Sequence, residues 1–116
     1  MDRFPDFMKN PINAIDSASQ SKGIEGWVFD GADGSQMAFW ECPLPGVSAE
    51  HSHSYDEYML VVQGLYTLII DGKKIPVEAG QEYLIPAGRA HSGEWPAATR
   101  TIHAFGGKRA LRKHET

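Results

Sequence analysis

The sequence predicts an all-β protein, a sandwich or barrel of short strands. Many short runs are rich in β-branched and aromatic residues, turn signals separate them, and no stretch keeps the 3.6-residue apolar period of a core helix. The runs are Trp27–Phe29, Met37–Cys42, Tyr58–Val62, Leu65–Ile70, Ile75–Val77, Tyr83–Ile85 and Thr99–Phe105. The turn signals lie at residues 30–34, 43–46, 71–72, 79–80 and 86–88.

The segment before the first run is less regular. We expect a short helix or an extended arm from Phe4 to Ile15. Its residues Phe4, Phe7 and Met8 need an apolar partner, either the wall of the barrel or a neighbouring subunit. After the first run, Asp30–Gly34 is expected to be a hairpin turn, because it lacks the further ligands and the terminal Glu of a calcium loop.

The two central runs, 58–62 and 65–70, are apolar at consecutive positions rather than alternate ones. This pattern is typical of strands that are covered on both faces. One face would line the interior of the barrel, and the other would pack on a second sheet or a second chain, so we expect a homodimer. Asp71-Gly72 after the second run predicts a type I′ hairpin turn, whose two central residues both have positive φ.

Composition excludes several classes of protein. The chain has 116 residues, 41% hydrophobic and 22% charged, which is typical of one globular domain. Its net charge is -4 and its basic residues are scattered, so a nucleic-acid partner is not expected. The absence of a long apolar run and of a signal-like start, together with a single cysteine, predicts a cytoplasmic protein away from membranes. The basic tail is expected to be a solvated end; its residues are Lys108, Arg109, Arg112 and Lys113.

Residues 51–57 carry the first chemical signal. His51 and His53 are two residues apart, so in a strand their imidazoles project from the same face. Glu57 follows after a stretch that can turn its carboxylate back toward them. Imidazole nitrogen with carboxylate oxygen suits a borderline divalent metal. Taken alone, the pattern fits a polar strand end equally well.

A second stretch, residues 80–91, favours the metal. It has a turn glycine, a short apolar strand and a Pro-Ala-Gly corner that ends in His91. The corner reverses the chain, so His91 begins another strand and can face back into the barrel. It would then supply a fourth ligand from a different strand.

Both stretches resemble the two motifs of the cupin superfamily. Residues 46–64 are similar to motif one, G-x5-H-x-H-x(3,4)-E-x6-G, but one residue is missing between Gly46 and His51. Residues 80–95 are similar to motif two, G-x5-P-x-G-x2-H-x3-N, but Trp95 replaces the final Asn, which puts the packing of this corner in doubt. The structural positions of the motifs are Gly46, Gly64, Gly80, Pro86 and Gly88.

The resemblance implies a single-domain jelly-roll barrel (a double-stranded β-helix), often dimeric, with a metal inside one mouth. We divide the chain into an N-terminal arm (1–22), a barrel (23–106) and a C-terminal tail (107–116). The resemblance also implies one divalent transition metal per chain, Fe, Mn, Ni or Zn, with His51, His53, Glu57 and His91 as its ligands. A barrel that keeps these residues but no longer holds metal is the alternative.

Other residues are candidates for the pocket. His103 shares a strand face with Thr101 and Phe105. It is either an inward group near the metal, with a catalytic, supporting or substrate-binding role, or an outward or hydrogen-bonded core histidine. Met59, Tyr83 and Phe105 are expected to line the substrate pocket. Glu41 is expected at an exposed strand end rather than beside the pocket.

The function that we predict is that of a metal-dependent enzyme of the dioxygenase, isomerase or lyase type acting on a small polar metabolite. A protein that binds or senses a small molecule through the metal, without catalysis, is the alternative. A further alternative is a cupin that modifies sugar acids, because the segment from His103 through Phe105 to Arg109 is similar to their aromatic-to-arginine pattern. Arg109 would then pair with a substrate carboxylate.

Overall fold

The computed structural model describes residues 1–16 and 23–115, so residues 17–22 of the predicted arm and residue 116 of the predicted tail lie outside the described residues. The described chain is built from strands, with short 3-10 turns near its two ends. The strands are β1 (Glu25–Asp30), β2 (Gln36–Cys42), β3 (Gly46–His51), β4 (Glu57–Gln63), β5 (Leu65–Ile70), β6 (Lys73–Glu78), β7 (Glu82–Ile85), β8 (His91–Trp95) and β9 (Thr99–Phe105). The all-β prediction is confirmed.

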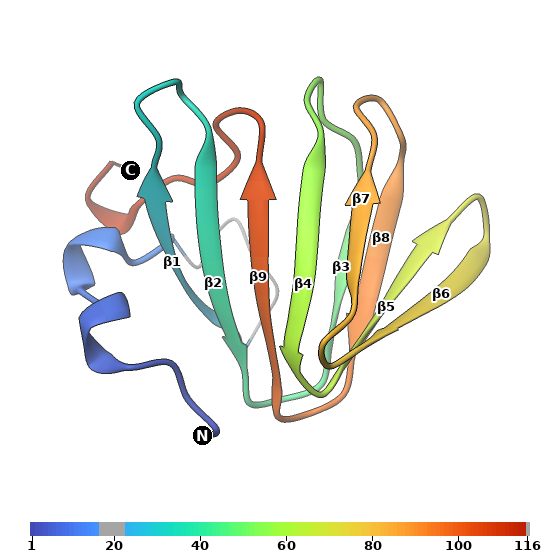
Figure 1. Ribbon diagram of the computed structural model, residues 1–116, viewed down its shortest axis with the longest axis horizontal. Coiled ribbons are helices and arrows are strands. Elements are labelled where there is room, and N and C mark those ends of the chain that lie inside the picture. Colours follow the sequence, from blue (N-terminus) through green and yellow to red (C-terminus); the bar gives the residue numbers. More distant parts are fainter. Residues whose placement is uncertain (17–22, 116) are drawn as a thin grey trace.

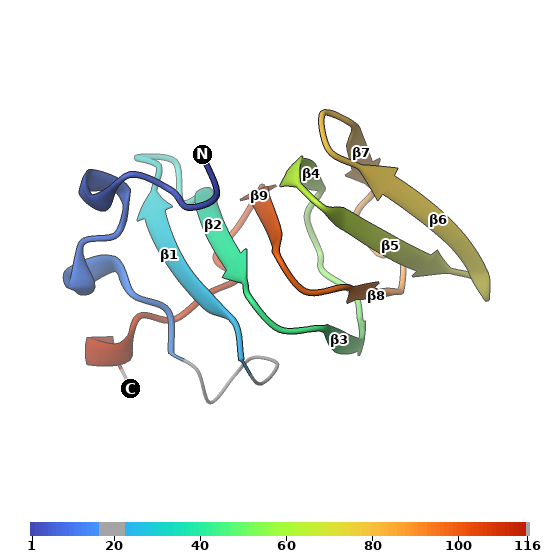
Figure 2. The ribbon, with the colours of Figure 1, turned by 90° about the horizontal axis from the view of Figure 1, so that it is seen from below.

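Two antiparallel sheets face each other (Figures 1 and 2). The five-stranded sheet has the order β1-β2-β9-β4-β7, and the four-stranded sheet has the order β3-β8-β5-β6. Consecutive strands often change sheet, as expected for a jelly roll. The chain alternates between the sheets so that β3 and β4, neighbours in sequence, bring the two halves of the first motif to opposite walls of the barrel.

Each predicted apolar run lies in a strand, and β8 begins at His91 as predicted. The strands β3 and β8 are the two that no apolar run indicates. Neither of them contains an apolar run, because β3 is an exposed edge strand and β8 carries His91, Ser92 and Glu94 among its five residues. The predicted hairpin turn is confirmed, since Asp71 has a φ of 52° and Gly72 a φ of 73°.

The interior holds two apolar clusters. One lies around Val28 and Ala38 on β1 and β2, and it includes Ile15, Phe105 and Ala110 from neighbouring segments. The other lies between β4, β5, β6 and β7 and comprises Met59, Val61, Leu68, Val77 and Ile85. The two clusters occupy opposite sides of the barrel, and the polar residues of the first motif lie where β3 and β4 meet the space between the sheets.

The N-terminal segment packs on the outside of the five-stranded sheet, beside β1 and β2 (Figure 1). It forms two 3-10 turns, η1 (Asp6–Met8) and η2 (Pro11–Asn13), in place of a longer helix. Phe4 is buried against Phe39, with a centroid distance of 5.8 Å, while Phe7 is 81% exposed. The barrel wall is therefore the partner of Phe4 but not of Phe7.

The prediction that Glu41 lies at an exposed strand end is wrong. Its side chain is not an exposed strand end, because its carboxylate accepts hydrogen bonds from the Phe4 backbone N–H at 2.8 Å and from Lys9 Nζ at 3.2 Å. The side chain is 16% exposed. It lies on the outer face of β2 and holds the N-terminal segment there, a contact between distant residues that no local pattern indicates.

The C-terminal tail corrects another expectation, because Arg112 is buried rather than solvated. Its guanidinium donates to the Val28 carbonyl and to Asp30 Oδ2, both at 2.8 Å, and to Asn13 Oδ1 at 3.2 Å. Arg112 thus joins both terminal segments to β1; η4 (Lys113–Glu115) follows it. Of the helices that the described residues form, none is long and apolar enough to cross a membrane.

Candidate metal centre

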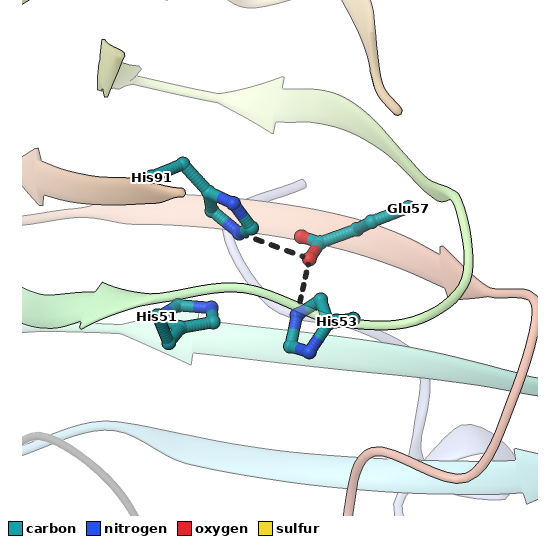
Figure 3. A group of neighbouring side chains, drawn as sticks. All are labelled: His51, His53, Glu57 and His91. Carbon is teal, nitrogen blue, oxygen red and sulfur yellow. Dashed lines mark hydrogen bonds and ion pairs between the residues drawn. The ribbon is translucent and has the colours of Figure 1, made fainter. Parts of the chain in front are cut away.

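Four side chains from three strand ends and one loop converge between the sheets (Figure 3). His51 is the last residue of β3 and His91 the first of β8, and the two are paired in register just beyond an irregularity in β3. Glu57 is the first residue of β4. The histidines come from the four-stranded sheet and its following loop, and the glutamate comes from the facing sheet.

The position of His53 differs from the one that a strand would give it. It lies beyond the end of β3, in the loop before β4, so the two-residue strand period does not place it beside His51. The loop nevertheless brings the rings together, with centroids 4.9 Å apart for His51 and His53 and 4.3 Å apart for His51 and His91. The convergence that the sequence indicated is present, but the loop before β4, rather than a strand, places His53.

Backbone carbonyls orient two of the histidine rings. His51 Nδ1 lies 2.8 Å from the Ala49 carbonyl, and His91 Nδ1 lies 2.9 Å from the Arg89 carbonyl. A carbonyl only accepts, so each Nδ1 carries the proton and each Nε2 keeps its lone pair. Such outer hydrogen bonds are typical of histidines that bind a metal through the other nitrogen.

Glu57 lies at the centre of the polar cluster. Its Oε1 is 3.1 Å from His53 Nε2 and 3.4 Å from His91 Nε2 (Figure 3). Burial by itself would raise the pKa of Glu57, but the hydrogen bond from His103 and the nearby His91 hold the pKa well below its usual range. The carboxylate is therefore ionised at neutral pH, as a metal ligand must be.

The pKa values of the histidines also suit ligation. Burial lowers the pKa of His51 and of His53, so both imidazoles are neutral at neutral pH. Burial acts in the same direction on His91, but Glu57 and the Arg89 carbonyl outweigh it and raise the pKa of His91. A bound cation would reverse that effect, because it competes with the proton for the same nitrogen.

The donor set fits a transition metal. His91 Nε2 is buried and makes no hydrogen bond, since Glu57 Oε1 at 3.4 Å is not aligned for one. The four residues each offer one ligand atom, and these atoms lie within 4.8 Å of one another. Ligand atoms around one ion are separated by at most about 4.4 Å at ordinary bond lengths of about 2.0–2.2 Å. Small side-chain movements would therefore complete the shell and satisfy His91.

Tyr55 positions His53, a role that the sequence analysis missed. The two rings stack, with centroids 5.0 Å apart and planes 2° apart. Gly107 lies against Tyr55, where a β-carbon would collide with the phenol ring. The signal in the sequence is the Gly106-Gly107 pair, but nothing local connects it with a tyrosine about fifty residues earlier.

The Pro-Ala-Gly corner of the second motif holds the loop of the first. The Gly88 N–H donates to the His53 carbonyl at 2.7 Å, and the Ala87 N–H donates to Asp56 Oδ1 at 2.8 Å. Gly88 has a φ of 79°, which favours glycine. The corner therefore does more than reverse the chain toward His91, because it also fixes the backbone of His53.

The remaining motif positions serve packing. Gly64 and Gly80 have φ values of 80° and 87° at turns after β4 and β6. Trp95, which replaces the usual Asn, is 6% exposed and stacks on Tyr66 at 5.6 Å. Gly46 gives it room, because a β-carbon there would lie 2.6 Å from the indole. The corner is thus well packed with tryptophan in this position.

A cavity of about 660 Å³ opens beside the cluster, and His51, Glu57 and His91 form part of its wall. Phe105 lines it, as expected, but Met59 and Tyr83 do not. Met59 pairs with Tyr83 one pleat deeper than the Glu57–Ile85 pair, and both pack in the apolar cluster around Val61. Their place in that cluster, among β4, β5, β6 and β7, keeps them out of the cavity wall, whereas His103, paired with Met59, lines it.

His103 points into the barrel. It is 7% exposed, it lines the cavity, and its Nδ1 lies 2.8 Å from Glu57 Oε2. Of the two placements that the sequence left open, the inward one is present. Arg109, at the beginning of the tail, also lines the cavity, although its side chain is exposed.

The family model for the cupin domain matches residues 39–104, which is more than half of the chain. The chain belongs to the cupin family. The match contains both motifs and all four residues of the polar cluster. No curated protein sequence matches this cupin significantly.

Solved structures similar to this cupin have the same fold at low identity. KdgF from Halomonas sp. is 19% identical with a TM-score of 0.67, and the match covers 83% of this chain and 93% of that one. The polyketide cyclase RemF from Streptomyces resistomycificus is 18% identical with a TM-score of 0.65, covering 80% and 72%. A salicylate 1,2-dioxygenase from Pseudaminobacter salicylatoxidans is 12% identical with a TM-score of 0.66, covering 72% and 26%.

Proposed function

We propose that this cupin is a metal-dependent enzyme whose site holds one divalent transition metal and takes a small polar molecule from the adjoining cavity. The observation that carries the proposal is the position of the polar cluster in the cavity wall. Four protein ligands on an octahedral ion leave two neighbouring positions open, whereas four on tetrahedral zinc would close the shell. The metal, when bound, would act as a Lewis acid on a ligand in those positions.

The residues of the chain have distinct parts in this proposal. His51 and His91 offer Nε2 lone pairs and Glu57 offers Oε1, while His53 Nε2, which donates to Glu57 Oε1, would give up that proton to bind the metal. The wall of the cavity supplies aromatic side chains for the body of the ligand; they are Trp40, Tyr66, Trp95 and Phe105. Dioxygenase, isomerase and lyase chemistry all remain within the proposal, because similar folds are named for a cyclase and for a dioxygenase and fold does not select a reaction.

The position of Arg109 in the cavity wall favours an acidic ligand. Its charge contributes to the lowered pKa of both His51 and His53, after the larger effect of burial, so the guanidinium is within electrostatic reach of the cluster. A carboxylate is a group that arginine binds through two parallel hydrogen bonds. Arg109 in the cavity wall therefore favours a sugar acid or another small carboxylate as the ligand.

The test combines metal analysis with a substrate screen. Protein purified without added metal is analysed for elements, reconstituted with Fe, Mn, Ni or Zn, and screened with small carboxylates and sugar acids, with and without dioxygen. Turnover with one metal supports the enzyme. Tight ligand binding without turnover supports the alternative, a protein that binds or senses the molecule through the metal. Failure to bind any of the four metals contradicts both.

We also propose that this cupin is a homodimer formed through the outer face of the five-stranded sheet. One row of outward side chains crosses all of its strands in register and is apolar or aromatic; the row is Phe29, Met37, Ala104, Tyr58 and Leu84. Met37 and Leu84 are 45% and 57% exposed in the single chain. Such a row suits a symmetric contact, because each copy offers the same apolar surface.

Light scattering at micromolar concentration tests the dimer. The expected mass is twice the monomer mass of 12.8 kDa. Leu84→Glu should shift the protein to the monomer, since it places a charge in the apolar contact. Ile12→Glu, at a position that is 61% exposed on the N-terminal segment, is the control and should leave the mass unchanged. A monomeric wild type contradicts the proposal.

Location in the cytoplasm stays a prediction from the sequence.

A further inference from the structure

The two carboxylate oxygens of Glu57 have different surroundings. Oε1 faces the histidines of the cluster, at 3.1 Å from His53 Nε2 and 3.4 Å from His91 Nε2. Oε2 faces away from them and accepts a hydrogen bond from His103 Nδ1 at 2.8 Å. The carboxylate thus presents one oxygen to the metal position and has its second oxygen already engaged.

His103 is itself held in place. Its Nε2 lies 3.1 Å from Thr101 Oγ1, two residues away on the same face of β9. Its ring stacks on Phe105, with planes 15° apart, and meets the edge of Tyr66 at 5.7 Å. A neutral imidazole that donates from Nδ1 accepts at Nε2, where the Thr101 hydroxyl can donate. Both ring nitrogens are therefore occupied and neither is left for a substrate.

The number of oxygens that Glu57 gives to a metal determines how much of the shell stays open. Carboxylates bind metals through one oxygen or through both. With one oxygen, the site supplies four ligand atoms and an octahedral ion keeps two open positions. With both, it supplies five and keeps one. A substrate that chelates, or a substrate together with dioxygen, needs two.

We propose that His103, anchored by Thr101, is a positioning residue that holds Glu57 Oε2 so that Oε1 alone reaches the metal and two neighbouring coordination positions stay open. The inference rests on the metal site of the proposed function. Of the roles that the sequence left open for His103, it selects the supporting one, exerted through Glu57, over the catalytic one. Loss of metal-directing partners of this kind costs about 10- to 100-fold in metal affinity.

The experiment counts water molecules on bound Mn²⁺ by water-proton relaxation, alongside metal affinity by competition with a chromophoric chelator. Wild type should show two exchangeable waters. His103→Leu removes the donor and frees Oε2, so this variant should show one exchangeable water. Its metal affinity should fall by about 10-fold or more. His103→Asn should restore two waters, because the asparagine amide nitrogen stands near the position of Nδ1.

Two further variants separate positioning from a general effect of the substitutions. Thr101→Val keeps the shape but removes the partner of Nε2, so it should change the water count in the same direction as His103→Leu, and less completely. Thr99→Val removes an equally buried hydroxyl from the same face of β9, bonded to the Pro96 carbonyl, and should leave the count at two. Thr101→Val also serves if His103→Leu does not fold.

The outcomes separate the inference from the proposed function. A wild type that binds no metal overturns the metal site itself. A wild type that binds metal with two waters, together with a His103→Leu variant that keeps two or more waters and the same metal affinity, overturns the positioning role alone. One water in His103→Leu, restored to two in His103→Asn, supports it.

Discussion

Two ends of one strand behave differently in this cupin. Glu57, Met59 and Val61 point from β4 to the same interior, but Glu57 belongs to the polar cluster and the other two to an apolar cluster. Met59 and Val61 are fully buried among aliphatic side chains. Glu57 is 5% exposed, yet it borders a cavity of about 660 Å³. The end of β4 around Met59 and Val61 is thus filled, and the end at Glu57 is open.

The comparison shows which forces hold each end. The filled end is stabilised by burial of apolar surface, which needs no particular geometry beyond good packing. The open end places ionisable groups in a dry interior, so it depends on hydrogen bonds and, we propose, on a cation. Its loops are joined by specific contacts, such as those from Ala87 and Gly88 to the segment before Glu57.

The largest expected effect breaks the open end. His91→Ala or His51→Ala should remove most of the metal, since three ligands hold a labile ion less well than four. Metal per chain is measured after dialysis against a mild chelator, with His114→Ala, an exposed histidine in η4, as the control. The wild type should also lose stability on chelation, by about 2.7 kcal/mol if the free metal stood at 100 times its Kd. Equal metal content in all four proteins would contradict the site.

The next effect breaks the filled end and spares the open one. Met59→Ala should lower the free energy of unfolding by about 2–5 kcal/mol, because it leaves a cavity in a fully buried cluster. Urea unfolding of the metal-free protein measures this. Leu44→Ala, at a position that is 57% exposed, should change it by about 0.5 kcal/mol or less. If Met59→Ala lost its metal while remaining stable, the two ends would not be separable.

A smaller effect concerns the support of His53. Gly107→Ala adds a β-carbon where the Tyr55 ring lies, so it should displace the ring that stacks on His53. We expect metal affinity to fall about 10-fold, the lower end of the range for outer partners of metal ligands. Gly106→Ala is the matched control, because its β-carbon would meet Tyr55 at an ordinary 3.4 Å. The same affinity in both variants would remove Tyr55 from the site.

The smallest effect lies outside both ends, where Arg112 joins the termini to β1. The hydrogen bond from Gln36, and then Arg112, keep the pKa of Asp30 below its ordinary value of 3.8. A lowered folded pKa stabilises the fold above pH 3.8 and loses that contribution as pH falls through the folded value. Asp30→Asn should therefore be less stable than wild type at neutral pH, by about 1 kcal/mol or less because the Asp30 side chain is half exposed, and should converge with it in acid. A difference that grew in acid would contradict this sign.

Local sequence patterns predicted a feature correctly where that feature depends on the backbone of the residue itself or on its neighbours along the strand. The Asp71-Gly72 turn follows from the positive φ that its type requires, and the apolar runs follow from the covering of both strand faces. The polar strands β3 and β8 have no such signature, and His51 and His91 were placed through their motifs. Residue type and spacing indicated the donor set, because few combinations of His and Glu in a buried region are tolerated without a partner.

Long-range contacts account for the expectations that were wrong. The sequence predicts exposed side chains for Glu41 and Arg112, but each is covered by a segment far away in sequence. Contact of Met59 and Tyr83 with a substrate stays a prediction; strand alternation gives the face on which a side chain lies but not its neighbours there, and both side chains pack in the apolar cluster rather than in the cavity wall.

The sequence by itself determined the all-β class, the cupin motifs and the donor set of His51, His53, Glu57 and His91, since these depend on residue type and on spacing along the chain. Only the tertiary structure decided that a loop rather than a strand places His53, that Tyr55 stacks on it, and that His103 turns inward to Glu57 Oε2. The physical reason is that each of these depends on how distant strands are paired, and the register between β4 and β9 is a property of the packed barrel rather than of either strand.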